Sequence, residues 1–209
     1  MIIIGFTVDD FKVFNQQTVA GRMALIRGQL DPKFELLGAT ISKQLATENI
    51  PAFINVAKHL RRHTNPAPNT WFAIGPYKRG YKMVPHFEVG FWDDRLFVWL
   101  CLLENIQQPA PYAAILHQQQ NLIKQLPVGQ WQLSGNHMAK PIQPLNAANL
   151  AAQTQRFIDV KKGEWLLGKV WLKTDPIFQT SGAVEVEIKQ SIKQLTPLYR
   201  YLLAAIRED

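Results

Sequence analysis

The chain has 209 residues, of which 47% are hydrophobic and 19% are charged, a composition that provides one core and excludes wholesale disorder. The apolar run at the N-terminus, Met1–Ile4, is shorter than the roughly 7–15 residues of a secretory signal, and the longest apolar run, 96–103, is well short of the roughly 18 of a membrane helix. The single Cys excludes an internal disulfide. We therefore expect a single cytoplasmic domain, residues 1–209, with no membrane partner.

Positive charge is unevenly distributed along the chain. The formal net charge is +7, and no acidic residue lies between Glu48 and Glu88. Six basic residues lie in that interval: Lys58, Arg61, Arg62, Lys78, Arg79 and Lys82. The rest of the chain therefore carries a net charge of only +1. A local positive field attracts anions better than a diffuse one, so this basic segment is the first candidate site.

Helical patterns occupy the first part of the chain. Thr7 and Asp10 have the spacing of a capping box, and Asp31 precedes a Pro as the N-cap of a longer helix would. That helix should continue to Leu45. A further helix is predicted over 51–63, because its apolar residues recur at helical spacing. They are Phe53, Val56, Ala57 and Leu60.

The middle of the chain changes to a period of two. Residues 70–74 have the composition of a strand, and 85–92 alternate between two faces. Asp93-Asp94 is predicted to form a two-residue turn, and the nearly unbroken apolar run 95–103 should pair with the preceding strand as a hairpin. One face of the first hairpin strand would carry His86, Glu88, Gly90 and Trp92.

The last part of the chain mixes both patterns. Helices are expected over 111–126 and 146–160 and from 180 onward, with strands at 130–134 and 164–173. Helices thus come first, a hairpin follows, and helices then alternate with the last strands. This order predicts an α+β fold, a two-layer domain whose mainly antiparallel sheet has helices packed on one side.

Several stretches together resemble the YktB-like family of uncharacterised bacterial proteins. They are Lys58-His59-Leu60-Arg61-Arg62, Asn65-Pro66, Thr70-Trp71, Lys78-Arg79-Gly80-Tyr81-Lys82, Pro85-His86-Phe87 and Leu96-Phe97-Val98-Trp99. The resemblance implies a compact, cytosolic α+β domain. It implies no activity and no catalytic residues, so the function must be inferred from the side chains.

The leading functional hypothesis is non-catalytic binding of a small anionic ligand, a nucleotide or a phosphometabolite. A helix over 51–63 would gather its cations on one side, and a turn at Gly80 would bring a second basic group to the same hollow. Aromatic residues between them could stack a base. The alternative is a solvated basic face paired with nearby acids. The candidate ligand-binding residues are Lys58, His59, Arg61, Arg62, Trp71, Lys78, Arg79, Tyr81, Lys82, His86 and Glu88.

His86 and Glu88 support a second hypothesis, that of an enzyme. Two residues apart on one strand face, they point the same way and could exchange a proton as acid and base. In the plainer interpretation, Glu88 pairs with an Arg of the basic segment. A third hypothesis is a nucleic-acid- or protein-interaction module, although the signatures of RNA-binding modules and zinc fingers are absent.

No metal or cofactor is predicted from sequence motifs. His59 and His63 have the spacing of helical metal ligands, but Leu60-Arg61-Arg62 between them lacks the Glu of the zinc-protease motif and adds positive charge. Cys101 lies between two Leu residues and is expected to be a small buried side chain. No phosphate-binding loop, dinucleotide fingerprint or nucleophile elbow is present.

Overall fold

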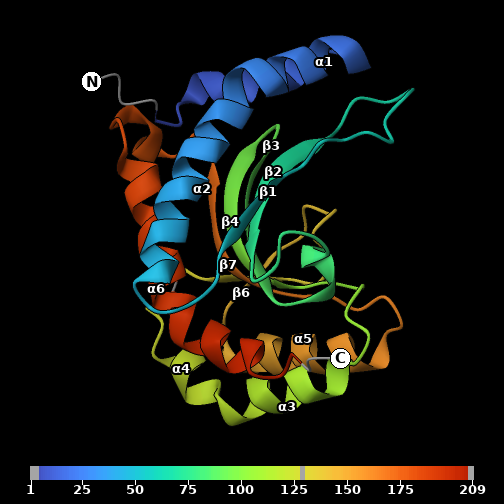
Figure 1. Ribbon diagram of the computed structural model, residues 1–209, viewed down its shortest axis with the longest axis vertical. Coiled ribbons are helices and arrows are strands. Elements are labelled where there is room, and N and C mark those ends of the chain that lie inside the picture. Colours follow the sequence, from blue (N-terminus) through green and yellow to red (C-terminus); the bar gives the residue numbers. More distant parts are fainter. Residues whose placement is uncertain (1–4, 128–129, 207–209) are drawn as a thin grey trace.

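The computed structural model describes residues 5–127 and 130–206 (Figure 1). Within these residues, one seven-stranded sheet has the order β1-β2-β3-β4-β7-β5-β6, and every neighbouring pair is antiparallel. The strands are β1 (Phe53–Val56), β2 (Asn69–Gly75), β3 (His86–Trp92), β4 (Arg95–Leu102), β5 (Gln132–Ser134), β6 (Gln143–Pro144) and β7 (Trp165–Leu172). The predicted α+β class with an antiparallel sheet is confirmed. The expected domain bounds, 1–209, reach into residues outside the described ranges.

The helices contribute to one large core against the first face of the sheet. The α-helices are α1 (Val19–Leu25), α2 (Asp31–Ala46), α3 (Pro109–Gln118), α4 (Gln120–Lys124), α5 (Ala147–Asp159) and α6 (Ala183–Leu203). The 3-10 helices are η1 (Val8–Asn15), η3 (Tyr81–Met83) and η4 (Pro176–Gln179), and η2 (Ile26–Leu30) is a π-helical segment. Figure 1 shows α2 and α6 alongside the curved central strands. Within the described ranges, no helix is long and apolar enough to cross a membrane.

The β3–β4 hairpin forms as the alternation predicted. Phe91 pairs with Leu96, so Asp93 and Asp94 are the turn. Phe87, Val89 and Phe91 point to the helical core, and the other set of side chains points to the second face of the sheet. Every residue of β3 is buried, because loops cover that second face.

The second face of the sheet is aromatic and is covered by loops instead of helices. Its buried cluster comprises Trp71, Ala73, Trp92, Phe97, Trp99, Cys101, Leu103 and Leu166. Ala57, Tyr81 and Ile142, from three different connections between strands, pack against it. Gly90 and Gly168 provide room for these rings, since a Cβ at Gly90 would lie 2.6 Å from the Cβ of Trp71. The candidate residues His86 and Glu88 lie on this face.

The predicted helix over 51–63 is wrong. Phe53–Val56 is the edge strand β1, paired from Phe53↔Gly75 to Val56↔Phe72, and 57–63 has no regular helix. Its apolar spacing fits a helix, but pairing with β2 satisfies the backbone and packs the half-buried Ile54 against α2, beside Gly38. His59 has a positive φ of 50°, which no helix over this segment could contain.

Asp31 is not an N-cap, which is a second correction. The helix is continuous from α1 through η2 into α2, and Asp31 has helical dihedral angles. The backbone N–H of Asp31 donates to Ile26 O, a bond one residue longer than in an α-helix. Because Pro32 lacks an N–H and its ring crowds the preceding turn, this π-type turn accommodates it within the helix. The capping box is confirmed in part, since the Thr7 N–H donates to Asp10 Oδ2 at 2.7 Å.

Candidate functional site

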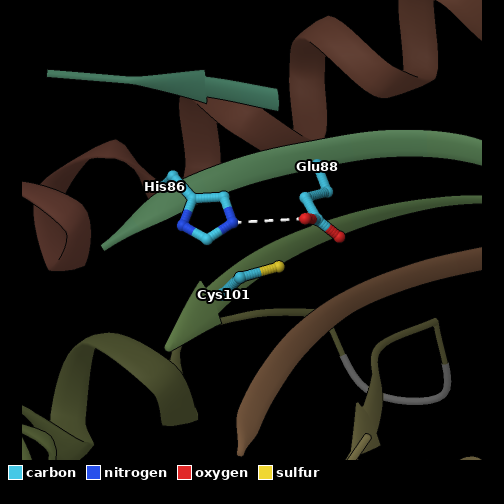
Figure 2. A group of neighbouring side chains, drawn as sticks. All are labelled: His86, Glu88 and Cys101. Atoms are coloured by element: carbon cyan, nitrogen blue, oxygen red, sulfur yellow. Dashed lines mark hydrogen bonds and ion pairs between the residues drawn. The ribbon is translucent and has the colours of Figure 1, made fainter. Parts of the chain in front are cut away.

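His86 and Glu88 form a fully buried pair on the second face of the sheet. Their Nε2 and Oε1 atoms are 3.3 Å apart, and the side chains are 0% and 1% exposed. Figure 2 shows both pointing toward Cys101 of β4, which is the cross-strand partner of His86. The predicted shared face is therefore observed. The predicted alternative partner for Glu88, an Arg of the basic segment, is not the one it contacts.

One proton holds this buried pair together. His86 Nδ1 lies 2.8 Å from the carbonyl oxygen of Val84, so Nδ1 must carry a hydrogen and Nε2 faces the carboxylate. Burial raises the pKa of Glu88, but the hydrogen bond from His86 and the nearby positive charges outweigh it and lower the pKa below its ordinary value. The pair therefore shares one proton, which lies between His86 Nε2 and the carboxylate of Glu88.

A second buried carboxylate–histidine pair lies next to the first. Glu164, at the start of β7, accepts from the backbone N–H of His137 at 2.7 Å and from its Nδ1 at 2.8 Å. Lys82 Nζ lies 3.4 Å from the other ring nitrogen of His137. With Nδ1–H donating to the carboxylate, Nε2 is left facing the ammonium. Sequence reasoning missed both His137 and Glu164, because no motif links residues 27 positions apart.

Trp71 is the centre around which the candidate side chains meet. The Lys82 ammonium lies over its ring at 5.2 Å, and the His59 and His137 rings approach it edge-on at 5.5 and 6.1 Å. Its indole N–H donates to the hydroxyl of Tyr81 at 3.2 Å. Trp71 is only 7% exposed, so these neighbours occupy the faces that a base would need for stacking. The stacking role predicted for Trp71 is not supported.

Tyr81 connects this arrangement to the buried pair. Its ring lies 5.0 Å from that of His86, roughly perpendicular to it. Burial, with Glu88 nearby, raises the pKa of Tyr81, so the phenol stays protonated at neutral pH.

His59 is half-buried and neutral. Its Nε2 lies 3.1 Å from Thr70 Oγ1. Burial first, and then the charges of Arg62 and Lys82, lower the pKa of His59 to about 4. Arg62 belongs to the first basic stretch, residues 58–62, and Lys82 to the second, residues 78–82. The charges of both stretches therefore act on the imidazole of His59. His59 also has a positive φ of 50°, in the left-handed region. A non-glycine residue there costs free energy unless its surroundings hold it, and such strain is often found at functional sites.

The remaining cations do not join this group. The three basic residues around Gly80 diverge: Lys82 faces His137, Lys78 lies over the ring of Phe53 at 5.8 Å, and Arg79 lines a different hollow beside Tyr112. Lys58 and Arg61 are exposed. The convergence expected from the sequence is thus limited to one residue of each stretch.

Within residues 5–127 and 130–206, the six cations of the basic segment have no carboxylate partners. Among the described residues, no salt bridge involves Lys58, Arg61, Arg62, Lys78, Arg79 or Lys82. The described residues therefore do not show the alternative, a basic face whose cations pair with neighbouring acids. Their positive field is left to act on molecules in solution.

Comparison with known proteins identifies similar chains without an assigned activity. A family model described as "Domain of unknown function (DUF1054)" matches residues 6–199. The chain is 44% identical to a "UPF0637 protein" of Lacticaseibacillus casei over 198 residues, covering 95% of this chain and 97% of the relative. It is 36% identical to a "UPF0637 protein" of Enterococcus faecalis over 200 residues, covering 95% and 98%. The resemblance seen in the sequence is confirmed.

Proposed function

This chain belongs to the DUF1054 family, whose description assigns no activity, and we propose from its geometry that it binds a small anion at the surface formed by Arg62 and Lys82. We call this surface the Arg62–Lys82 face, and it also includes His59, Trp71 and His137. The single observation that carries the proposal is that Lys82 and His59 meet on the ring of Trp71, with Arg62 in the same turn as His59. Neither cation has a carboxylate partner among the described residues.

Lys82 is held in place for this role. Its ammonium interacts with the π-face of Trp71 and donates to His137, and neither contact neutralises its charge. His137 is in turn fixed by Glu164. A cation that is oriented before the ligand arrives loses less conformational entropy on binding than a free surface Lys.

The ligand class follows from what surrounds the cations. Arg62 offers a planar fork suited to phosphate or carboxylate, and Lys82 offers a point charge. Trp71 is buried and already in contact on its ring face and edge, so it supplies no platform for a base. The proposal is therefore for a phosphate- or carboxylate-bearing ligand recognised through its anionic group.

The acid–base enzyme hypothesis gains less from the geometry. It requires His86 and Glu88 to line a cavity with cations in reach. They are instead buried, and they satisfy each other. The non-catalytic interpretation needs no such exposure, because its contacts are made by side chains at the surface.

Thermal unfolding with inorganic phosphate, sulfate and ATP tests the proposal. A ligand at 100 times its Kd stabilises the folded state by about 2.7 kcal/mol. We expect phosphate to raise the Tm, and Lys82→Gln and Arg62→Gln to weaken binding at least tenfold. ATP should bind no more tightly than inorganic triphosphate, since the base finds no stacking surface.

Arg79→Gln is the matched control, because it removes the same charge from the same segment but from a different hollow. It should leave phosphate affinity within about twofold. If phosphate gives no stabilisation at constant ionic strength, or if all three variants weaken it equally, the proposal is wrong and only a diffuse positive field remains.

A further inference from the structure

The side chains of His86, Glu88 and Cys101 form a compact group of three potential metal ligands. An imidazole nitrogen, a carboxylate oxygen and the thiol sulfur all lie within 4.8 Å of one another. Figure 2 shows the three side chains directed at a common point from β3 and β4. We propose that this group is a binding site for a divalent transition-metal ion such as Zn²⁺.

The strand register produces this arrangement. His86 and Cys101 are paired directly across β3 and β4, and Glu88 follows His86 by two positions on the same face. Opposed side chains in an antiparallel pair are close enough to share one ligand. Because both strands lie in the centre of the sheet, their backbones hold the three donors without help from a loop.

The distances suit a tetrahedral ion. A zinc site with bonds of about 2.0–2.3 Å keeps its ligand atoms about 3.3–3.8 Å apart. The His86 Nε2 and Glu88 Oε1 atoms already have this separation, at 3.3 Å. Only small side-chain shifts would bring the sulfur of Cys101 to the same spacing. Three protein ligands leave the fourth tetrahedral position to a small ligand such as a water molecule.

The hydrogen bond between His86 and the carbonyl of Val84 favours metal binding as well. A ligating His normally donates its other ring N–H to a carbonyl or carboxylate, which fixes the tautomer and orients the ring. His86 Nδ1 does this with Val84 O at 2.8 Å, and Nε2 is left facing the group.

Charge balance explains how a buried site could hold the ion. When a divalent ion binds, the proton between His86 and Glu88 and the thiol proton of Cys101 are both released to solvent. The ligands then comprise a neutral imidazole, a carboxylate and a thiolate, whose charge of −2 neutralises the ion. A neutral cluster avoids the large cost of an isolated buried charge. The thiolate donor selects borderline-soft ions such as Zn²⁺ and Co²⁺ over Mg²⁺.

Cobalt titration of the purified chain, free of any affinity tag and treated with chelator, tests this site. Cys101 is the single Cys of the chain, so a thiolate-to-cobalt charge-transfer band can arise from no other residue. We expect one Co²⁺ per chain with this band and with visible absorption of tetrahedral intensity. Addition to the folded protein and refolding in the presence of Co²⁺ are both measured, because the site is buried.

Variants assign the ligands. Cys101→Ser should abolish the band, and His86→Gln and Glu88→Gln should each weaken Co²⁺ binding by about 100-fold or more. His59→Gln is the control, since His59 lies outside the group, and it should keep both the band and the affinity. Zn²⁺ should displace Co²⁺ and raise the Tm of the unmodified chain, while Mg²⁺ should do neither.

The absence of stoichiometric Co²⁺ binding after both procedures would overturn the proposal, as would binding without the charge-transfer band. These measurements on the unmodified chain do not depend on whether the variants fold. The site uses no residue of the phosphate experiment, so either proposal can fail without the other.

Discussion

Glu164 accepts hydrogen bonds from both the backbone N–H and the imidazole Nδ1 of His137, at 2.7 and 2.8 Å. The carboxylate is 3% exposed and fixes the loop that brings His137 to Lys82. The charge of one buried residue thus holds together two segments of the Arg62–Lys82 face.

Replacing this carboxylate with an amide should destabilise the fold. In Glu164→Gln, an amide NH₂ replaces one of the two accepting oxygens, so one N–H of His137 loses its acceptor. We expect a loss of about 1–3 kcal/mol in the free energy of unfolding. Urea denaturation at pH 7 measures it. Glu104→Gln, at an exposed neighbouring position, should change stability by no more than about 0.5 kcal/mol. Equal losses in the two variants would contradict the role given to Glu164.

Gly168→Ala should be strongly destabilising. A Cβ at Gly168 would lie 1.8 Å from the carbonyl oxygen of Val98 and 2.7 Å from the ring of Trp99, so β4 and β7 would have to separate. The expected loss is about 3 kcal/mol or more, from overpacking at the sheet centre. Gly28→Ala is the matched control. It has no neighbour within 4 Å and lies in helical backbone, so it should gain up to about 1 kcal/mol.

His59 should give the protein a pH-dependent stability. Its pKa is about 4 when folded, against an ordinary value of 6.5. As the pH falls from about 6.5 to about 4, the unfolded chain takes up a proton that the folded chain refuses, so stability decreases across that window. We expect His59 to contribute about 2 kcal/mol of this loss.

Urea denaturation of the unmodified chain and of His59→Gln, at pH 7 and pH 4.5, isolates this contribution. His59→Gln should lose less stability on acidification, because Gln does not titrate. His63→Gln, at an exposed position in the same loop, should behave like the unmodified chain. An unchanged pH dependence in His59→Gln would show that His59 is not kept neutral by its surroundings.

Asp31 should give a pH dependence of stability opposite in sign to that of His59. Burial, followed by repulsion from Glu35, raises the pKa of Asp31 to about 6, and its Oδ1 has no hydrogen-bond partner among the described residues. The folded state therefore binds this proton more tightly than the unfolded state, and stability is lost as the pH rises from about 3.8 to about 6.

Asp31→Asn should accordingly stabilise the chain at pH 7 by about 1 kcal/mol, after allowance for the partial exposure of Asp31. Most of the gain should disappear at pH 3.5, where the folded state is protonated and the unfolded state is mostly protonated, and chemical denaturation at the two pH values measures it. Glu35→Gln, which removes only the repulsive neighbour, should give a smaller gain. A loss of stability in Asp31→Asn at pH 7 would disprove the explanation.

The sequence predicted what depends on local pattern. The β3–β4 hairpin and the common face of His86 and Glu88 follow from a strict period of two and a two-residue turn. Strand β1 could not be recognised in this way, since Phe53, Val56 and Leu60 also fit a helical stripe. Pairing with β2, a contact between segments that are separate in the chain, determines that Phe53–Val56 is a strand.

The candidate site was predicted only in part for the same reason. Lys82, His59 and Trp71 belong to the basic segment and were identified from its charge and aromatic content. Their contact with His137 and Glu164 depends on a loop and a strand from much later in the chain. No spacing within the sequence marks that contact. Tertiary contacts also determine that the three cations around Gly80, Lys78, Arg79 and Lys82, point in different directions. No local sequence pattern predicts this.

The strand order has a consequence for how the chain is made on the ribosome. Strand β7 lies between β4 and β5, although it is synthesised more than 60 residues after β4. Until Trp165–Leu172 has emerged, β4 presents an unpaired apolar edge. The nascent chain therefore passes through a long interval in which the apolar edge of β4 can pair with a strand of another chain.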